Sequence, residues 1–246
     1  MANKYKVFMR KMRLLLKLSG EIMGGKVCLD IASSQCRRVA LAIASLKEYG
    51  YQIGVVIGGG NVCRGISLSE LGMRRQVADQ VGMLATLING LALQDALIQC
   101  NCDAILMSAI ECPKVAELYR WDKAQTYLDS GIIAIFAGGT GNPYFTTDTA
   151  AALRANEINA DLLLKATKVD GIYDKDPLLY HDAIFYEKIS YSQCLAQKLQ
   201  VMDATSIALC MSSFLPIRVF NMQLLYSADF PRLLLQGSFG TLISGE

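Results

Sequence analysis

The sequence predicts an α/β protein in which helices cover a mainly parallel sheet. Short apolar runs alternate along the chain with segments of helical period, and the links between them are short. The chain has 246 residues, of which 52% are apolar and 19% charged, so it can bury a sizeable core. It shows no internal repeat and no proline- or serine-rich linker. Composition therefore does not divide it into separate units.

Apolar runs bounded by turn residues predict the strands. They cover residues 13–18, 53–57, 104–107, 132–136, 160–166, 216–220 and 240–243. Helical periodicity and capping residues predict the helices. They cover residues 30–49, 74–98, a short segment within 113–129, a segment that starts near 150, and then 191–200, 203–213 and 224–235. Asp30 is the expected N-cap of the first helix, and Gly50 the residue that follows its C-terminus.

The predicted helix over residues 74–98 is apolar on most faces. Asn89, Gln94 and Asp95 interrupt its longest apolar stretch, so we expect a central helix or one that packs on another subunit rather than a membrane span. Asp79 lies near the start of this helix. A carboxylate there either stabilises the helix N-terminus or accepts hydrogen bonds from a sugar hydroxyl.

Composition argues against several classes of function. A net charge of +2 gives no global field for nucleic acid or an anionic membrane surface. The eight cysteines contain no Cys-x-x-Cys pair and His181 has no partner histidine, so we expect no metal site and free thiols in a reducing compartment. The basic N-terminus lacks a signal-peptide cleavage site. We expect a cytoplasmic protein that binds neither nucleic acid nor membrane.

A glycine loop after the strand over residues 132–136 organises the chain. Three glycines within residues 138–141 let the backbone turn sharply and approach a ligand. Residues 146–148 are N-cap residue types, and an alanine-rich helical segment follows them. A strand, a glycine loop with free N–H groups and a helix N-terminus together favour a bound anion. A plain glycine-rich turn is the alternative.

A second glycine loop covers residues 58–65 and follows the strand over residues 53–57. Its three consecutive glycines bring the backbone close to a neighbour, and Arg64 offers a planar fork to phosphate oxygens. The spacing does not match G-x-G-x-x-G, and the chain contains no G-x-x-x-x-G-K-[ST]. The sequence therefore argues against both a Rossmann fingerprint and a P-loop.

Two lysines occupy equivalent positions in two of the predicted strands. Lys17 and Lys165 each lie near the C-terminal end of an apolar strand, and a third loop, residues 167–177, follows the second of them. An unpaired buried lysine is costly, so we expect an anionic partner; a surface position on an edge strand is the alternative for Lys17. Ligands bind at the carboxyl ends of strands in open α/β sheets. Two lysines there, with Arg64, can neutralise a polyphosphate.

With these pieces placed, the chain resembles the bacterial uridylate (UMP) kinases of the amino-acid-kinase superfamily, from about residue 14 to residue 243. Each shared motif is moderately specific alone, and together they follow the family's order and spacing. They are Lys17-Leu-Ser-Gly20, Val56-Ile-Gly-Gly-Gly-Asn61 with Arg64-Gly65, Gly82-Met-Leu-Ala-Thr86, Thr140-Gly-Asn-Pro-Tyr-Phe-Thr-Thr-Asp148, Lys165-Ala-Thr-Lys-Val-Asp-Gly171 and Pro216-Ile-Arg-Val-Phe-Asn221.

The resemblance implies a three-layer αβα sandwich with a mainly parallel central sheet, the amino-acid-kinase fold. It implies one domain over residues 1–246, with an acceptor-nucleotide lobe over about 12–160 and an ATP lobe over about 161–246. The implied reaction transfers the γ-phosphate of ATP to UMP in pyrimidine nucleotide biosynthesis, with Mg²⁺ accompanying ATP. It also implies a homohexamer, a trimer of dimers, with the helix over 74–98 as an interface.

The resemblance also assigns residues to the two nucleotides. ATP would contact Lys17, Leu18, Ser19, Gly20, Gly60, Arg64, Thr167, Tyr173 and Asp176. UMP would contact Gly59, Arg64, Asp79, Thr140, Gly141, Asn142, Pro143, Tyr144, Phe145, Thr146 and Thr147. Within that set Asp79 would take the ribose hydroxyls and Arg64 the 5′-phosphate.

Phosphoryl transfer needs positioning and cations rather than covalent chemistry from the protein. We predict that Lys17, Lys165 and Mg²⁺ stabilise the transferred charge. The third predicted catalytic residue, Asp148, orients the lysines by charge pairing and does not act as a base, because a UMP phosphate is already anionic at pH 7.

Several points stay open at the level of sequence. Residues 21–30 depart from the longer glycine-rich loop of many GTP-activated members, which leaves GTP activation and UTP inhibition undecided. A superfamily member acting on a carboxylate or carbamate is one alternative, and glutamate or aspartate turnover without UMP binding would favour it. A nucleotide-sensing subunit is disfavoured because Lys17, Asp148 and Lys165 occur together. A Rossmann oxidoreductase is weakened by the loop spacing, and nicotinamide binding would revive it.

Overall fold

The computed structural model describes residues 11–24, 31–62, 72–199 and 201–245. Arg64 and Asp30, both singled out above, lie outside these residues. Most strands of the large sheet have apolar, mostly buried sequences, and the two short strands at its edges are the exceptions. The strands are β1 (Arg13–Leu18), β2 (Gln52–Ile57), β3 (Ala104–Ser108), β4 (Glu117–Leu118), β5 (Ile133–Ala137), β6 (Leu162–Thr167), β9 (Lys188–Ser190), β10 (Ile217–Asn221) and β11 (Thr241–Ser244).

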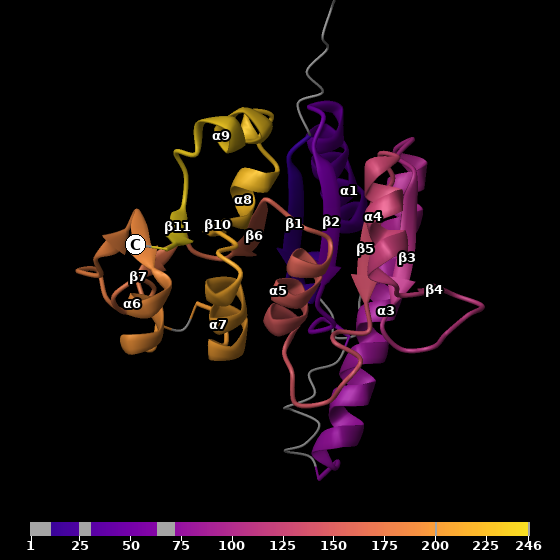
Figure 1. The fold of residues 1–246 in the computed structure, drawn as a ribbon, viewed down its shortest axis with the longest axis horizontal. Helices are drawn as coiled ribbons and strands as arrows, with labels where there is room; N and C mark the ends of the chain where they lie inside the picture. Colours follow the sequence, from indigo (N-terminus) through magenta and orange to yellow (C-terminus); the bar gives the residue numbers. More distant parts are fainter. Residues whose placement is uncertain (1–10, 25–30, 63–71, 200, 246) are drawn as a thin grey trace, which may run out of the picture.

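Within the described residues these strands form a nine-stranded sheet in the order β4-β3-β5-β2-β1-β6-β10-β11-β9 (Figure 1). Each pairing in it is parallel except that of β10 with β11. A separate antiparallel pair joins β7 (Ile172–Tyr173) and β8 (Phe185–Tyr186). The predicted α/β class with a mainly parallel central sheet is confirmed.

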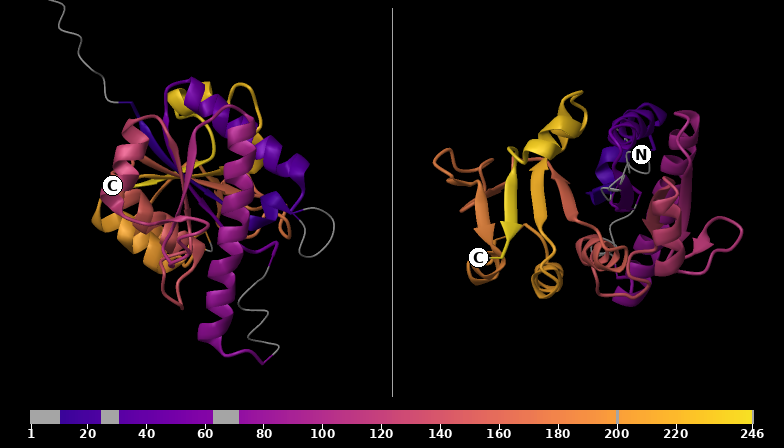
Figure 2. Two further views of the ribbon diagram at one scale, coloured as in Figure 1. Left: turned by 90° about the vertical axis from the view of Figure 1, so that its right-hand side faces the viewer. Right: turned by 45° about the horizontal axis from the view of Figure 1, so that its top comes forward.

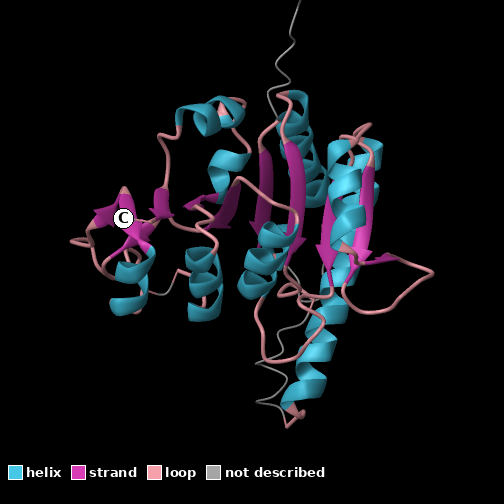
Figure 3. Ribbon diagram, viewed as in Figure 1, coloured by secondary structure: helices cyan, strands magenta, loops and turns pink. Residues whose placement is uncertain are grey.

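Helices cover both faces of the sheet, which gives three layers (Figures 2 and 3). One layer contains the short 3₁₀ helix η1 (Gly20–Met23), α1 (Ser33–Glu48), α3 (Arg75–Gln99), α8 (Met222–Leu225) and α9 (Phe230–Gln236). The other contains α4 (Trp121–Asp129), α5 (Thr147–Glu157), α6 (Tyr191–Ala196) and α7 (Ala204–Ser212).

Side-chain alternation along β1 explains how the sheet serves both layers. Leu14, Leu16 and Leu18 belong to the core under α1 and α3, whereas Leu15 belongs to the core under α5. Successive side chains of a strand point to opposite faces, so Lys17 shares the face of Leu15. Since β1 lies between β2 and β6, Lys17 is not on an edge strand.

Some predicted helices differ from the observed ones at their ends or in their continuity. The helix predicted from residue 30 begins at Ser33 with Ala32 as its N-cap, although Gly50 follows its C-terminus with a φ of 94° as expected. The helix predicted over 224–235 is instead two helices, α8 and α9, separated by a turn. Pro231 lies in the first turn of α9. Proline is tolerated there but would break a helix interior.

Several short elements carry no clear sequence pattern. The strands β4, β7, β8 and β9 have two or three residues each and were not predicted. The helix predicted over 191–200 ends at Ala196. Such elements are too short to show periodicity, and their neighbours in the sheet hold them.

The helix α3 has the length and mean hydropathy, 1.5, of a membrane span, but half of that window is buried inside the protein. It packs against β3, β5 and α1. Its N-terminal end projects beyond the carboxyl ends of the strands (Figure 1). In this structure α3 is a core helix with one exposed face.

Candidate active site

Lys17 and Lys165 lie side by side near the carboxyl ends of two adjacent strands. The parallel pairing of β1 with β6 sets Lys17 directly opposite Lys165. The alternation that points Leu15 and Leu163 toward the α5 layer gives both lysines the same direction. The register of the sheet thus brings two ammonium groups together under the N-terminus of α5.

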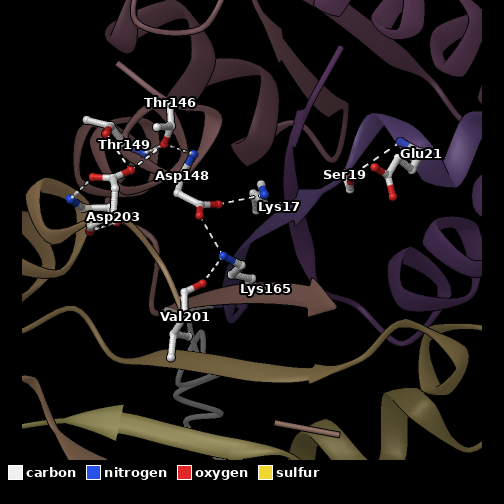
Figure 4. A network of polar contacts seen from close by, with 10 residues as sticks. Lys17, Ser19, Glu21, Thr146, Asp148, Thr149, Lys165, Val201 and Asp203 are labelled. Atoms are coloured by element: carbon white, nitrogen blue, oxygen red, sulfur yellow. Dashed lines mark hydrogen bonds and ion pairs between the residues drawn. The ribbon is translucent and has the colours of Figure 1, made fainter. Parts of the chain in front are cut away.

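The carboxylate of Asp148 joins these two lysines (Figure 4). One of its oxygens lies 2.7 Å from the Lys17 Nζ, and the other lies 2.7 Å from the Lys165 Nζ. The side chains of Lys17, Lys165 and Asp148 are 13%, 11% and 15% exposed. Lys165 also donates a hydrogen bond to the Val201 carbonyl. The anionic partner predicted for the lysines is therefore Asp148.

Burial and charge act in opposite directions on this cluster. Burial alone would raise the pKa of Asp148, but the positive charges of Lys17 and Lys165 outweigh it and hold that pKa below its usual value. Burial is the main cause that lowers the pKa of Lys165, the nearby Lys17 adds to it, and Asp148 opposes it. Lys17, Lys165 and Asp148 together carry two positive charges and one negative charge, and the Asp203 carboxylate also favours the charged form of Lys165. The excess positive charge lies on the lysine ammonium groups, which suits them to bind a further anion.

The N-terminus of α5 is fixed by its capping residue. The Thr146 hydroxyl oxygen accepts hydrogen bonds from the N–H groups of Asp148 and Thr149. The same hydroxyl donates to the Asp203 carboxylate at 2.5 Å, and the Thr149 hydroxyl donates to it at 2.9 Å. Asp203 in turn caps α7. These contacts fix the backbone from which Asp148 reaches the lysines.

Three loops meet beside the lysine pair. A Cβ added to Gly20 would lie 2.6 Å from both the Gly58 O and the Gly60 N, so the loop after β1 touches the loop after β2. The Gly58 N–H donates to the Leu18 carbonyl at 3.0 Å. The Thr147 hydroxyl lies 3.6 Å from the position of a Cβ on Gly58, which brings the start of α5 to the same place. Ser19 caps η1 next to Gly20.

The segment from Thr140 to Thr147 leads from the loop after β5 to the N-terminus of α5. The Gly141 N–H donates to the Gly138 carbonyl at 2.9 Å, and the Asn142 N–H donates to the Thr140 hydroxyl at 3.2 Å. Pro143 is half-buried, whereas Tyr144 and Phe145 are exposed.

Asp79 connects that segment to α3. Its carboxylate accepts a hydrogen bond from the Tyr144 N–H at 2.8 Å and pairs with Arg75 at 2.8 Å. Tyr144 has a φ of 72°, which is uncommon for a residue with a side chain. The Asp79 carboxylate, which the resemblance assigned to the ribose hydroxyls, thus binds the backbone of the loop over residues 140–147 in this structure.

A cavity of about 700 Å³ extends from Lys165 along the loop after β6, within the usual range for small-molecule sites. Thr167, Tyr173 and Asp176, which the resemblance assigned to ATP, line it together with Lys165. The Thr167 hydroxyl donates hydrogen bonds to the Val169 and Phe220 carbonyls, which fix its position. In the described part of the chain, no group of three or more His, Cys, Asp or Glu side chains is placed to hold a metal.

Some residues of this region have contacts that the sequence did not predict. Asp203 and Val201 contact the cluster around Asp148. On α3, Asn89 is fully buried and hydrogen-bonds the loop after β2. Its signal in the sequence was a polar residue within an apolar helix, where a buried amide needs a specific partner.

Comparison with known proteins places this architecture in a family of kinases. The model of the amino acid kinase family matches residues 12–221. The chain therefore belongs to the amino acid kinase family.

Within that family the chain is similar to uridylate kinases. The uridylate kinase of Protochlamydia amoebophila is 57% identical over 231 residues, 94% of this chain and 92% of the relative. That of Photorhabdus laumondii is 48% identical over 95% of this chain and 96% of its own length. The family resemblance predicted from the motifs is confirmed.

Solved structures agree with this grouping. The UMP kinase of Bacillus anthracis matches with a TM-score of 0.90 at 36% identity, covering 95% of this chain and 96% of that one. The UMP kinase of Ureaplasma parvum matches with a TM-score of 0.88 at 37% identity, covering 96% and 100%. The predicted amino-acid-kinase fold is confirmed.

Proposed function

We propose that this chain is a UMP kinase that transfers the γ-phosphate of ATP to UMP, giving ADP and UDP for pyrimidine nucleotide biosynthesis. The observation that carries the proposal is the pair of buried lysines that share Asp148 beside three converging loops. The names of the similar proteins, uridylate kinase and UMP kinase, support the same reaction.

The proposed mechanism relies on positioning and charge. Phosphoryl transfer places negative charge on the equatorial oxygens of the moving group and requires attacking and leaving oxygens roughly in line. Lys17 and Lys165 offer two ammonium groups to those oxygens. Asp148 holds the ammonium groups in place. No general base is needed, because the attacking oxygen belongs to an anionic phosphate.

The two nucleotides divide the site between the lobes. ATP occupies the cavity beside Thr167, Tyr173 and Asp176, in the lobe over about residues 161–246, and its phosphates reach Lys17 and the loops at Gly20 and Gly60. UMP occupies the side formed by Gly59, Asp79 and residues 140–147, in the lobe over about residues 12–160. Support comes from the contacts that join these loops at Gly58 and Thr147. The bare amides of such loops suit phosphate oxygens.

Mg²⁺ would accompany ATP and neutralise charge on its phosphates. The described residues do not supply a ligand set of their own for it, and Asp148 already pairs with both lysines. We therefore assign the ion to the phosphate oxygens, as magnesium in phosphoryl-transfer sites is largely held by substrate, and derive no step through it.

A homohexamer built as a trimer of dimers is part of the proposal. Leu84, Ile88, Leu91 and Ile98 are between 46% and 54% exposed and recur at helical spacing along α3. An exposed apolar stripe of this kind marks an interaction surface. We assign it to a second copy of the chain and place the enzyme in the cytoplasm, where buried thiols such as Cys194 and Cys210 stay reduced.

A coupled assay of ADP release tests the function. The acceptors are UMP, CMP, dUMP, glutamate and aspartate, each with ATP and Mg²⁺. We expect ADP release that depends on UMP and stops when UMP is exhausted. Turnover of glutamate or aspartate without UMP would replace the proposed function with that of another family member.

A further inference from the structure

Two buried polar side chains, Thr86 and Asn89, lie one turn apart on the sheet-facing side of α3. They are 5% and 0% exposed and lie between apolar neighbours such as Leu87 and Leu93. Burying a hydroxyl or an amide is costly unless its hydrogen bonds are satisfied. Both side chains are satisfied, and their partners belong to different loops.

Asn89 binds the loop that follows β2. Its side-chain N–H₂ group donates to the Gly58 carbonyl at 2.7 Å and to the Asn61 side-chain oxygen at 2.7 Å. The Asn61 amide returns a hydrogen bond to the Asn89 oxygen at 3.1 Å. Between these contacts the backbone at Gly59 rests on the helix, because a Cβ there would lie 2.7 Å from the Ala85 Cβ.

Thr86 binds the loop that follows β5. Its hydroxyl oxygen accepts a hydrogen bond from the Gly138 N–H at 2.7 Å and donates to the Met83 carbonyl at 2.7 Å. Gly138 is the first residue after β5 and opens the loop that continues into residues 140–147. Since β2 and β5 are neighbours in the sheet, a single helical turn holds the ends of two adjacent strands.

We propose that Thr86 and Asn89 are positioning residues that set the distance between the two glycine loops. The inference rests on the proposed function, in which the loop at Gly59 and Gly60 contacts both nucleotides and the loop after Gly138 contacts UMP. An in-line transfer depends on the separation of donor and acceptor phosphates, and a misplacement of about 1 Å can cost about 100-fold in rate. Neither side chain needs to touch a substrate to act in this way.

The test compares variants on one helix that remove or keep a single polar group. Asn89→Leu removes the amide that holds Gly58, and Thr86→Val removes the hydroxyl that holds Gly138. Gln94→Leu is the matched control, because Gln94 also donates from α3 to a backbone carbonyl, that of Ala104 at 3.0 Å, away from both loops. Thr86→Ser keeps the hydroxyl and serves as the rescue variant.

We expect Asn89→Leu to lower kcat by about 10- to 100-fold at saturating ATP and UMP. Thr86→Val should raise KM for UMP by about tenfold, the effect of one lost hydrogen bond, with KM for ATP nearly unchanged. Thr86→Ser and Gln94→Leu should stay within about twofold of wild type in both constants. The inference is overturned if Gln94→Leu and Asn89→Leu lose kcat equally, or if Thr86→Val raises both KM values alike.

Amide hydrogen exchange gives a readout that needs no substrate. In Thr86→Val the Gly138 amide should exchange faster, and in Asn89→Leu the amides of residues 58–61 should, with the rest of the sheet unchanged. Unchanged exchange in both variants would overturn the inference even if the enzyme phosphorylates UMP. Failure of wild type to phosphorylate UMP would instead overturn the proposed function, and the exchange result would still decide the positioning role.

Discussion

One carboxylate, that of Asp148, stabilises the charges of two neighbouring lysines, Lys17 and Lys165. Two ammonium groups at neighbouring positions of a sheet repel each other, and both are largely buried. Asp148 reaches each of them at 2.7 Å, so one carboxylate serves two ammonium groups and leaves one positive charge among these three side chains in excess. A phosphate chain offers the missing negative charge, which is a reason for the site to bind ATP.

Lys17→Ala should lower kcat by on the order of 10²–10³, the usual cost of removing one preorganised electrostatic group. The fold should survive, because Asp148 keeps its pairing with Lys165. Steady-state kinetics with UMP, together with a thermal melt, measures both quantities. Lys123→Ala is the control, since Lys123 on α4 forms an ion pair at 2.5 Å with Glu117 of the edge strand β4 but is 48% exposed. Near wild-type kcat in a folded Lys17→Ala enzyme would remove Lys17 from the mechanism.

Asp148→Asn should destabilise the protein at pH 7 by an amount that shrinks in acid. Burial opposes the charged form, but Lys17 and Lys165 hold the pKa of Asp148 below the usual 3.8. As the pH falls below about 4, the unfolded chain therefore binds the proton first, and the stabilising contribution is lost as the pH falls through the folded pKa.

Chemical denaturation between pH 7 and pH 3 measures the gap, which is the difference in the free energy of unfolding between wild type and Asp148→Asn. Asp122→Asn is the control. The hydrogen bond from Arg120 lowers the pKa of Asp122 as well, but the side chains of Arg120 and Asp122 are 61% and 42% exposed, so water screens the pair and the difference should be small. A gap for Asp148→Asn that is constant across this range would show that the carboxylate is not held charged by the lysines.

At the scale of elements, the loops depend on close contact between backbones. Gly20→Ala would place a Cβ 2.6 Å from backbone atoms of Gly58 and Gly60, which forces one loop away from the other. We expect a loss of about 1–3 kcal/mol in the free energy of unfolding and a higher KM for ATP.

Gly82→Ala is the matched substitution on α3. A Cβ at Gly82 meets nothing within 4 Å, so this variant should be neutral or gain up to about 1 kcal/mol from helix propensity. Chemical denaturation and KM measurements on both variants test whether the two loops are in close contact. Equal stability and equal KM for Gly20→Ala would contradict the close approach of the two loops.

The long elements and the lysine pair were predictable from the sequence because each carries its own signal. Apolar runs predict β1 and β6. Each run has a lysine near its C-terminal end, Lys17 or Lys165, and this repetition indicates a charged site at that end of the sheet. An anionic partner was expected from the buried lysines, and Asp148 was predicted to pair with them, as it does. N-cap residue types marked the helix start that holds it.

The contacts of α3 were not predictable in this way. Asn89 appeared only as an interruption of an apolar stretch, because its partners Gly58 and Asn61 are 31 and 28 residues away in the chain. The break between α8 and α9 was also missed. It depends on Pro231 starting a new helix, whereas the apolar pattern runs on through the turn.

At the scale of the whole molecule, α3 connects the site to the surface. Its inner side holds the two glycine loops through Thr86 and Asn89, and its outer side exposes the leucine and isoleucine stripe. A second copy of the chain packed on that stripe would lie one helix away from the bound nucleotides.

Ile88→Glu should weaken that assembly, because a charge would be buried in an apolar interface. Light scattering coupled to size exclusion should show a smaller particle than wild type. Leu41→Glu is the control, since Leu41 is similarly exposed, at 52%, but lies on α1. An unchanged mass for Ile88→Glu would place the subunit contacts elsewhere.

The most direct test is a crystal structure with a bisubstrate analogue, in which adenosine and uridine are joined through their 5′-positions by a chain of phosphates. We predict the adenosine in the cavity beside Tyr173, the uridine against residues 140–147, and the phosphates between Lys17, Lys165 and the amides near Gly20 and Gly60. A phosphate chain that leaves both lysines paired only with Asp148, or a uridine bound away from residues 140–147, would contradict the account.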